Sequence, residues 1–274
     1  MRATPVTTRP PIRTMSDAPG LERFELELLG GGVERRYRAL RPEVERMPWG
    51  RFDAATLDEA TRARAQRDWT ASAFQEYRTA LACAATVHAL LDARAPVDLV
   101  AVASRFPLDE LVHVELCARM AMAHGGGAAI EYAPGDLIDA APDGLPPLLA
   151  AADMAVRFFC VGETASVAML RRAWKSAKDP LSRAILGRIV KDEAAHGAFG
   201  WIFLDWALPQ LDAPALAHLG VAATGGVAGL RMLWDDVRAR MVGPGVATYF
   251  ALAEQVLADR IVAPLAQRGI VVAQ

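Results

Sequence analysis

The stretches DELVH (Asp109–His113) and DEAAH (Asp192–His196) repeat one pattern, Asp-Glu-x-x-His, within a chain of 274 residues. Residues three apart share a face of an α-helix, so each glutamate and its histidine can bind one metal ion together. The chain has only five histidines, and two of them occupy this position. The repeated pattern therefore predicts a metal site that joins two helices.

Two further glutamates, Glu76 and Glu163, lie within apolar helical stripes, as do Glu110 and Glu193 of the repeated pattern. The stripe around Glu163 is formed by Val156, Phe159, Cys160, Val167 and Leu170. An unpaired buried carboxylate is very costly, and no Lys or Arg occupies the matching stripes. Bound cations would compensate these charges directly. Four carboxylates, one on each of four helices, therefore predict a metal centre.

The composition predicts an all-α fold. Hydrophobic residues make up 53% of the chain, and long stretches with helical periodicity outweigh any strand pattern. Four long helices are expected at about 57–93, 97–123, 146–178 and 180–207. Pro107 predicts a kink or a break in the second of them.

The connections predict how these helices are arranged. Short connections follow the first and third helices, so each begins an antiparallel pair. The long connection between the second and third helices can cross the length of a bundle. We expect three regions: residues 1–56 as a partly disordered N-terminal extension, 57–210 as the four-helix bundle, and 211–274 as C-terminal helices. These last helices are expected at about 213–241, with a Gly break, and 245–268.

With this order of motifs, the chain resembles the ferritin-like di-metal carboxylate superfamily over residues 65–207. The resemblance implies a ferritin-like four-helix bundle with a long crossover between helices two and three. In that family Glu110 and Glu193 would bridge two metal ions. One ion would be completed by Glu76 and His113, and the other by Glu163 and His196.

Three further residues are candidate supports of the site. Ligating histidines usually donate their second N–H to a carboxylate or a carbonyl group. Similarity to bacterial multicomponent monooxygenases implies that Asp109 and Asp192 each serve the histidine of the other motif, although both could be solvated acids on the adjacent helix face. Ser166 follows Glu163 by one turn, where some family members carry a hydroxyl near the oxygen site, and a packing role is the alternative.

The ligand set favours two iron ions, with manganese or a mixed pair as alternatives. The resemblance implies a di-iron oxidase or monooxygenase that uses O2 and an external electron donor to oxidise a small organic substrate. A ferroxidase or an iron storage and detoxification protein is one alternative, and a non-enzymatic, metal-stabilised binding protein is another. Ile189 replaces the extra histidine of the N-oxygenases, and Val167 replaces the hydroxyl of many hydroxylases, so the subfamily is unassigned.

Other features restrict the partners and the location. The formal net charge is −2 with no basic patch, which argues against nucleic-acid binding. Ala213–Leu230 is the most apolar stretch, but it contains His218 and is not expected to span a membrane. The first twenty residues lack the apolar core of a signal peptide. We expect a cytoplasmic monomer or homodimer with Cys83, Cys117 and Cys160 as buried free thiols.

Four polar residues lie outside the predicted site. We expect surface or capping roles for the remaining histidines and a solvated position for one acid; these residues are His88, His124, His218 and Glu115.

Overall fold

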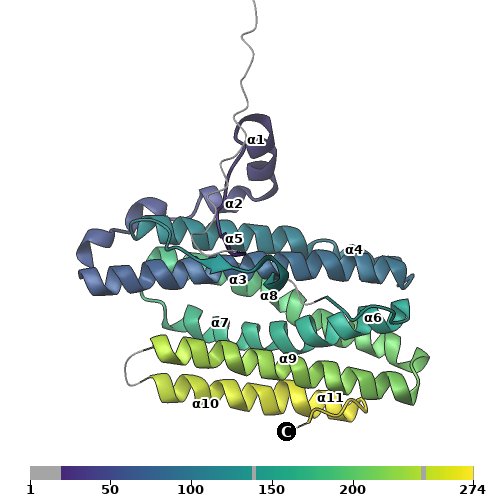
Figure 1. Cartoon of the computed structure of the whole chain (residues 1–274). Helices are drawn as coiled ribbons and strands as arrows, with labels where there is room; N and C mark the ends of the chain where they lie inside the picture. Colours follow the sequence, from purple (N-terminus) through teal and green to yellow (C-terminus); the bar gives the residue numbers. More distant parts are fainter. Residues whose placement is uncertain (1–19, 138–139, 242–244, 274) are drawn as a thin grey trace, which may run out of the picture.

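The computed structural model describes residues 20–137, 140–241 and 245–273. Within these ranges the chain is mostly helical, as predicted. The strand pairing that it contains is short and antiparallel, between Glu22–Arg23 (β1) and Glu131–Tyr132 (β2). Figure 1 shows the long helices side by side in layers, with α3, α4 and α5 above and α9 and α10 below.

The first helical pair consists of α3 (Glu59–Asp92) and α5 (Phe106–Ala123), which pack along each other. The short helix α4 (Val97–Ala103) precedes α5, so the predicted interruption is a true break. Pro107 lies in the first turn of α5, where its missing N–H removes no helical hydrogen bond. The short connection therefore places these two helices side by side, as predicted.

The second pair consists of a long composite helix and α8 (Pro180–Ala207). The composite helix contains α6 (Pro147–Met154), a π-helix called η4 (Ala155–Glu163), and α7 (Thr164–Ser176). The helix predicted at about 146–178 is present, and its middle is a π-helix. At the end of η4 the backbone N–H of Thr164 donates to the carbonyl of Phe159, five residues earlier. This wider turn cannot be seen in a sequence interpreted with a period of 3.6 residues.

Two glycines on α8 allow its backbone to contact η4 and α7 directly. A Cβ atom added to Gly200 would lie 2.7 Å from Sγ of Cys160 and 2.8 Å from Cβ of Phe159. A Cβ atom on Gly197 would lie 2.9 Å from Cγ2 of Val167. The separation between these helices is therefore fixed by the absence of side chains on one face of α8.

The C-terminal region packs against this pair. It consists of α9 (Ala213–Arg240), α10 (Val246–Val256), the π-helix η6 (Leu257–Val262) and α11 (Ala263–Gln267). The predicted Gly break is absent, because α9 continues through Gly225 and Gly226. The site of a Cβ atom on Gly226 lies 3.5 Å from Cα of Arg157, which brings α9 close to η4.

One helix in the described ranges, α9, is long and apolar enough to cross a membrane. A single such helix is weak support for a membrane span, since core helices of soluble proteins have the same length and composition. The buried residues of α9 belong to the same hydrophobic cluster as those of η4, including Val156 and Phe159. Packing against η4 accounts for their apolar character.

Residues 20–51 form an N-terminal arm that contains α1 (Gly31–Leu40) and α2 (Pro42–Glu45). Figure 1 shows α1 projecting from the body, whereas α2 lies against it. Arg41 is 1% exposed, and its guanidinium lies 2.6 Å from Glu45 and 2.7 Å from Glu115. The expectation that Glu115 is solvated was therefore wrong, because this arm covers it.

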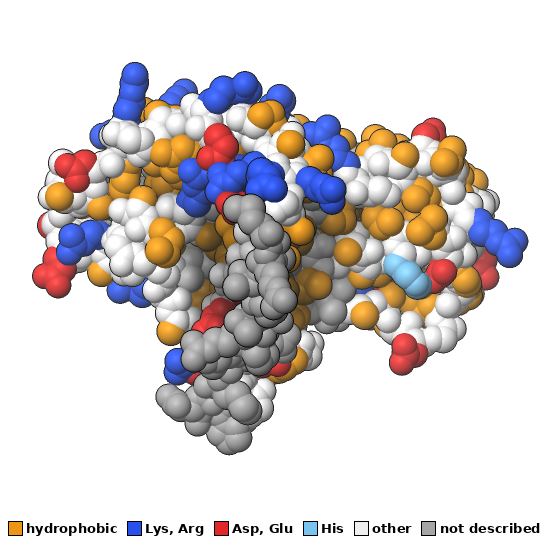
Figure 2. Space-filling model, turned by 90° about the horizontal axis from the view of Figure 1, so that it is seen from above, with side chains coloured by type: hydrophobic (Ala, Val, Ile, Leu, Met, Phe, Trp, Pro, Cys, Tyr) orange, Lys and Arg blue, Asp and Glu red, His pale blue; other side chains and the backbone are white. Residues whose placement is uncertain are grey.

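The face seen from above carries acidic and basic side chains interspersed along its edge (Figure 2). Hydrophobic side chains gather at the end of this face that α4 and the last turns of α3 form. Leu91, Val97 and Val102 are exposed there.

We predict that Gly200→Ala destabilises the protein by about 1–3 kcal/mol, because the new methyl group overlaps η4 and forces a backbone shift. Gly229→Ala is the matched control: Gly229 lies in α9 with open space around its Cβ position. That change should stabilise the helix by about 0.5–1 kcal/mol. Chemical denaturation measures both effects, and equal stability of Gly200→Ala and the natural protein would contradict the packing described above.

Candidate metal centre

The six predicted ligand residues lie in two overlapping groups. One contains Glu76, Glu110, His113 and Glu193; the other contains Glu110, Glu163, Glu193 and His196. In each group the possible ligand atoms lie within 4.8 Å of one another. Glu110 and Glu193 belong to both groups, so the arrangement can hold two adjacent cations with two shared carboxylates.

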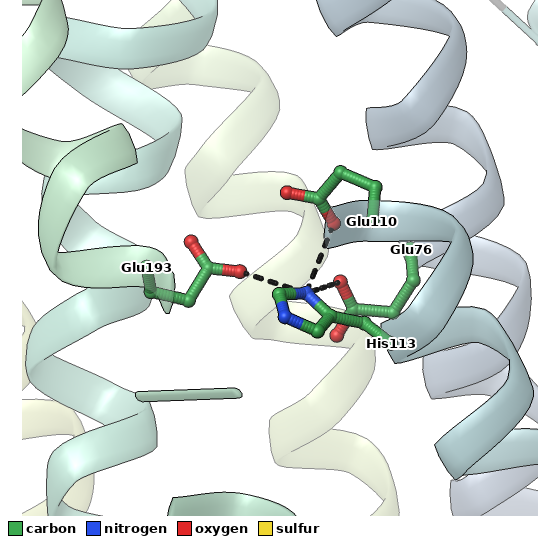
Figure 3. Close-up of side chains that lie close together, drawn as sticks. All are labelled: Glu76, Glu110, His113 and Glu193. Carbon is green, nitrogen blue, oxygen red and sulfur yellow. Dashed lines mark hydrogen bonds and ion pairs between the residues drawn. The ribbon is translucent and has the colours of Figure 1, made fainter. Parts of the chain in front are cut away.

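The histidines point their Nδ1 atoms at the carboxylates. Nδ1 of His113 lies 3.3 Å from Glu110, 3.3 Å from Glu193 and 3.6 Å from Glu76. Figure 3 marks these three contacts with dashed lines. Nδ1 of His196 lies 2.8 Å from Oε1 of Glu110 and 3.3 Å from Oε2 of Glu193. Each imidazole therefore presents one nitrogen to the space between the two shared carboxylates.

Several of these atoms lie close together without forming a hydrogen bond. Oε1 of Glu110, Oε2 of Glu193 and Nδ1 of His196 are buried and have no hydrogen-bond partner. Because Nδ1 of His196 is only 2.8 Å from Oε1 of Glu110, direction and not distance prevents the bond. Buried polar atoms normally find a partner, and a cation between these atoms would supply one. The donor set therefore fits a metal ion.

The cluster is largely buried, and Glu76 is its most exposed residue. The side chains of Glu110, His113 and His196 are 0% exposed, and that of Glu193 is 2% exposed. The side chain of Glu76 is 15% exposed. The side of the cluster formed by Glu76 on α3 is therefore the side nearest to water.

The π-helix carries Glu163 to the cluster. More residues fit into each turn of a π-helix than of an α-helix, so η4 changes the direction of the side chains that follow it. The end of η4 is fixed by Thr164, whose Oγ1 donates to the carbonyl of Phe159 and accepts from Nε1 of Trp201 on α8 at 3.1 Å. This link joins the residue after Glu163 to the helix that carries Glu193 and His196.

Burial raises the pKa of two of the glutamates. The pKa of Glu76 rises to about 8, because burial disfavours its carboxylate and the charges of Glu110 and Glu193 add to that effect. Burial also raises the pKa of Glu163 well above its ordinary value, with the same two neighbours contributing. Both shifts therefore favour the protonated form of these residues when the cluster holds only protons.

The two histidines are held in the charged form. Burial disfavours an imidazolium, but the carboxylates around His113 outweigh it and raise its pKa well above the ordinary value. The same balance raises the pKa of His196 to about 12. Burial opposes ionisation of Glu110 and Glu193, yet their contacts with both histidines lower the pKa of each.

These directions give a neutral cluster. Two carboxylates carry a charge, two are protonated, and two imidazolium ions balance the charged pair. Two divalent cations would balance four carboxylates and two neutral imidazoles equally well. Protons and metal ions therefore compete for the same groups.

Each aspartate of the repeated motif lies near the histidine of the other copy of the motif. Oδ2 of Asp192 lies 3.1 Å from Nε2 of His113, and Oδ2 of Asp109 lies 3.8 Å from Nε2 of His196. Both carboxylates are buried and do not lie on a solvated face. Ser166, in contrast, is partly exposed on α7, and no described contact joins its side chain to the cluster.

Two arginines next to these aspartates were missed from the sequence. Arg105 lies four residues before Asp109, and Arg188 lies four residues before Asp192. Each forms an ion pair with its aspartate. The repeated pattern is therefore longer, Arg-x-x-x-Asp-Glu-x-x-His, and comparison of the two stretches one turn further upstream reveals it.

The remaining histidines lie away from the cluster. His88 is exposed, as expected, and pairs with Asp92, while His124 caps α5 by contacting the carbonyl of Met120 at 2.8 Å. His218 has a different place from the one expected. Its Nε2 lies 2.8 Å from Oδ2 of the buried Asp153, so it joins α9 to α6.

The three cysteines are free and buried, as predicted. Burial raises the pKa of Cys83, and the carboxylates of the cluster add to this effect. Burial raises the pKa of Cys117 in the same way. These thiols therefore behave as small apolar side chains beside the cluster.

Comparisons with models of protein families, with curated proteins and with solved structures find no match to this chain.

We predict that binding of two divalent cations at pH 7 releases about four protons, from Glu76, Glu163, His113 and His196. The affinity should therefore rise with pH, and the product of the two dissociation constants should fall by about 10⁴ per pH unit between pH 6 and 7. Calorimetric titration with Mn²⁺ in buffers of different ionisation enthalpy counts the protons.

The matched variant is Glu163→Gln, which removes one titrating group and should release one proton fewer. Release of fewer than two protons by the natural protein would contradict the charge balance described above.

Proposed function

We propose that this chain is a ferritin-like di-metal carboxylate protein that binds two iron ions and oxidises a small organic substrate with O2. The observation that carries the proposal is the pair of four-residue groups that share Glu110 and Glu193. A bridged pair of this kind, with one Glu from each of two helices and Glu-x-x-His from each of two others, is typical of di-iron and di-manganese carboxylate bundles.

The chemistry of the ligands supports iron. Each group offers three carboxylates and one imidazole nitrogen, a set that suits iron or manganese better than zinc or copper. Two ferrous ions held side by side can together supply two electrons to O2, and an external reductant can restore them. The chain itself supplies the positions of the ligand side chains and buries most of them away from water.

The differences in exposure suggest how reactants reach the centre. Glu110 and Glu193 are enclosed by helices, whereas Glu76 has a partly exposed side chain. We infer that O2 and the substrate approach from the side of α3 that carries Glu76.

We predict that the anaerobically purified protein holds about two iron ions per chain and, with a chemical reductant, consumes O2 continuously. Glu163→Ala should reduce the iron content, because one group loses a ligand, and should lower O2 consumption to background while the helical circular dichroism is unchanged. An oxygen electrode and metal analysis measure these effects. Glu254→Ala is the control, since that exposed residue of α10 pairs with Arg231 on the surface.

Three outcomes would contradict the proposal. Normal O2 consumption by Glu163→Ala would show that the site is wrongly assigned. Rapid oxidation and mineralisation of added iron(II), with no turnover under any reductant and a large hollow assembly on a sizing column, would indicate iron storage. Unchanged folding and ligand binding after metal removal would indicate a non-enzymatic protein.

A further inference from the structure

The aspartates beside the two histidines are themselves held by arginines. Nε of Arg105 lies 3.0 Å from Oδ2 of Asp109, and a second nitrogen of Arg105 lies 4.0 Å from Oδ1 of Asp192. Arg188 pairs with Asp192 from the preceding turn of α8. Both aspartates are 6% exposed, so their charges lie in an environment where an ion pair is only weakly screened.

The position of each aspartate matters because it selects one nitrogen of a histidine. When Nε2–H donates to a carboxylate, Nδ1 keeps its lone pair and can bind a metal ion. In this protein Nε2 of His113 faces Asp192, and Nδ1 faces the glutamates. Nε2 of His196 faces Asp109 in the same direction, but at 3.8 Å and without a hydrogen bond, while its Nδ1 faces Glu110. An aspartate that turned away would release the imidazole from this orientation.

The two arginines lie in different surroundings. The side chain of Arg105 is 67% exposed, whereas that of Arg188 is 14% exposed. Nε of Arg188 donates to Oε1 of Glu43 at 3.0 Å. Glu43 belongs to α2 of the N-terminal arm, next to the fully buried Val44. A continuous series of contacts therefore leads from the arm to a predicted metal ligand: Glu43, Arg188, Asp192 and His113.

We propose that Arg105 and Arg188 are positioning residues of the metal centre, and that Glu43 makes the N-terminal arm part of one of its two metal sites. This inference rests on the metal-binding part of the proposed function. Arg188 acts through Asp192 on His113, which belongs to the group with Glu76. Arg105 acts mainly through Asp109 on His196, which belongs to the group with Glu163. The two arginines should therefore affect different ions of the pair.

The experiment is a titration of the metal-free full chain with Co²⁺ under nitrogen, followed by visible absorption. We expect Arg188→Gln and Arg105→Gln each to lower the affinity for one of the two Co²⁺ ions by about 10–100-fold and to alter the absorption bands of that ion. Arg188→Lys should recover part of the affinity because it keeps the positive charge beside Asp192. Glu43→Gln should lower the affinity for the same ion as Arg188→Gln does, but by a smaller factor.

Lys191→Gln is the matched control. Lys191 is exposed and directly precedes Asp192, so this variant removes one positive charge from the same stretch of α8 without removing an ion pair of the aspartate. It should bind both ions as the natural protein does. A melting curve for each variant separates loss of metal from loss of fold, and the exposed position of Arg105 keeps that variant informative.

Two results would overturn the inference. One is binding of both ions by the two arginine variants as tightly as by Lys191→Gln. The other is an equal loss at both ions in parallel with a lower melting temperature, which would show only general destabilisation. Failure of the metal-binding part of the proposed function is distinguishable, because the natural protein would then bind no Co²⁺ at the cluster, whereas failure of O2 turnover alone would leave this test unaffected.

Discussion

Burial of four carboxylates and two imidazoles in one helical core is the constraint on which the rest of the structure depends. Unbalanced charge at this depth would cost more than a domain of this size can supply. Two states would balance this charge: protons held by Glu76, Glu163 and both histidines, as the pKa shifts favour, or two divalent cations in their place. Both states require the same convergence of side chains, so the helices can keep one arrangement in either state.

Helix packing produces this convergence through close backbone contacts. Gly200 lets α8 touch Cys160 in η4, and η4 ends at Glu163. The residue after Glu163, Thr164, is tied to Trp201 on α8. The positions of the ligands on α8 and of Glu163 are therefore set by one interface. A change in the separation of these two helices would move Glu163 relative to both shared carboxylates.

Features that depend on local residue spacing could be predicted from the sequence. The positions of residues that depend on contacts between distant parts of the chain could not. The pairs Glu110–His113 and Glu193–His196 follow from three-residue spacing, and the helix ends follow from Pro and Gly. The π-helix interrupts the assumed period and was missed. Glu115 and His218 were misplaced because their partners, Arg41 and Asp153, are remote in sequence. The two arginines were visible in the repeated pattern, but their role depends on how the aspartates cross between helices.

The repeated pattern is symmetric in sequence, yet the structure makes its two halves unequal. On one side Arg188 is enclosed and held by Glu43 of the N-terminal arm; on the other, Arg105 is open to solvent. The first group also contains Glu76, the ligand nearest to water, whereas Glu163 lies deeper at the end of η4. The first group therefore combines His113, held through the enclosed Arg188, with the accessible Glu76. The second group combines His196, beside which the exposed Arg105 lies, with the more buried Glu163. If the proposed pair of ions is bound here, such a difference would let one ion exchange with reactants while the other stays fixed.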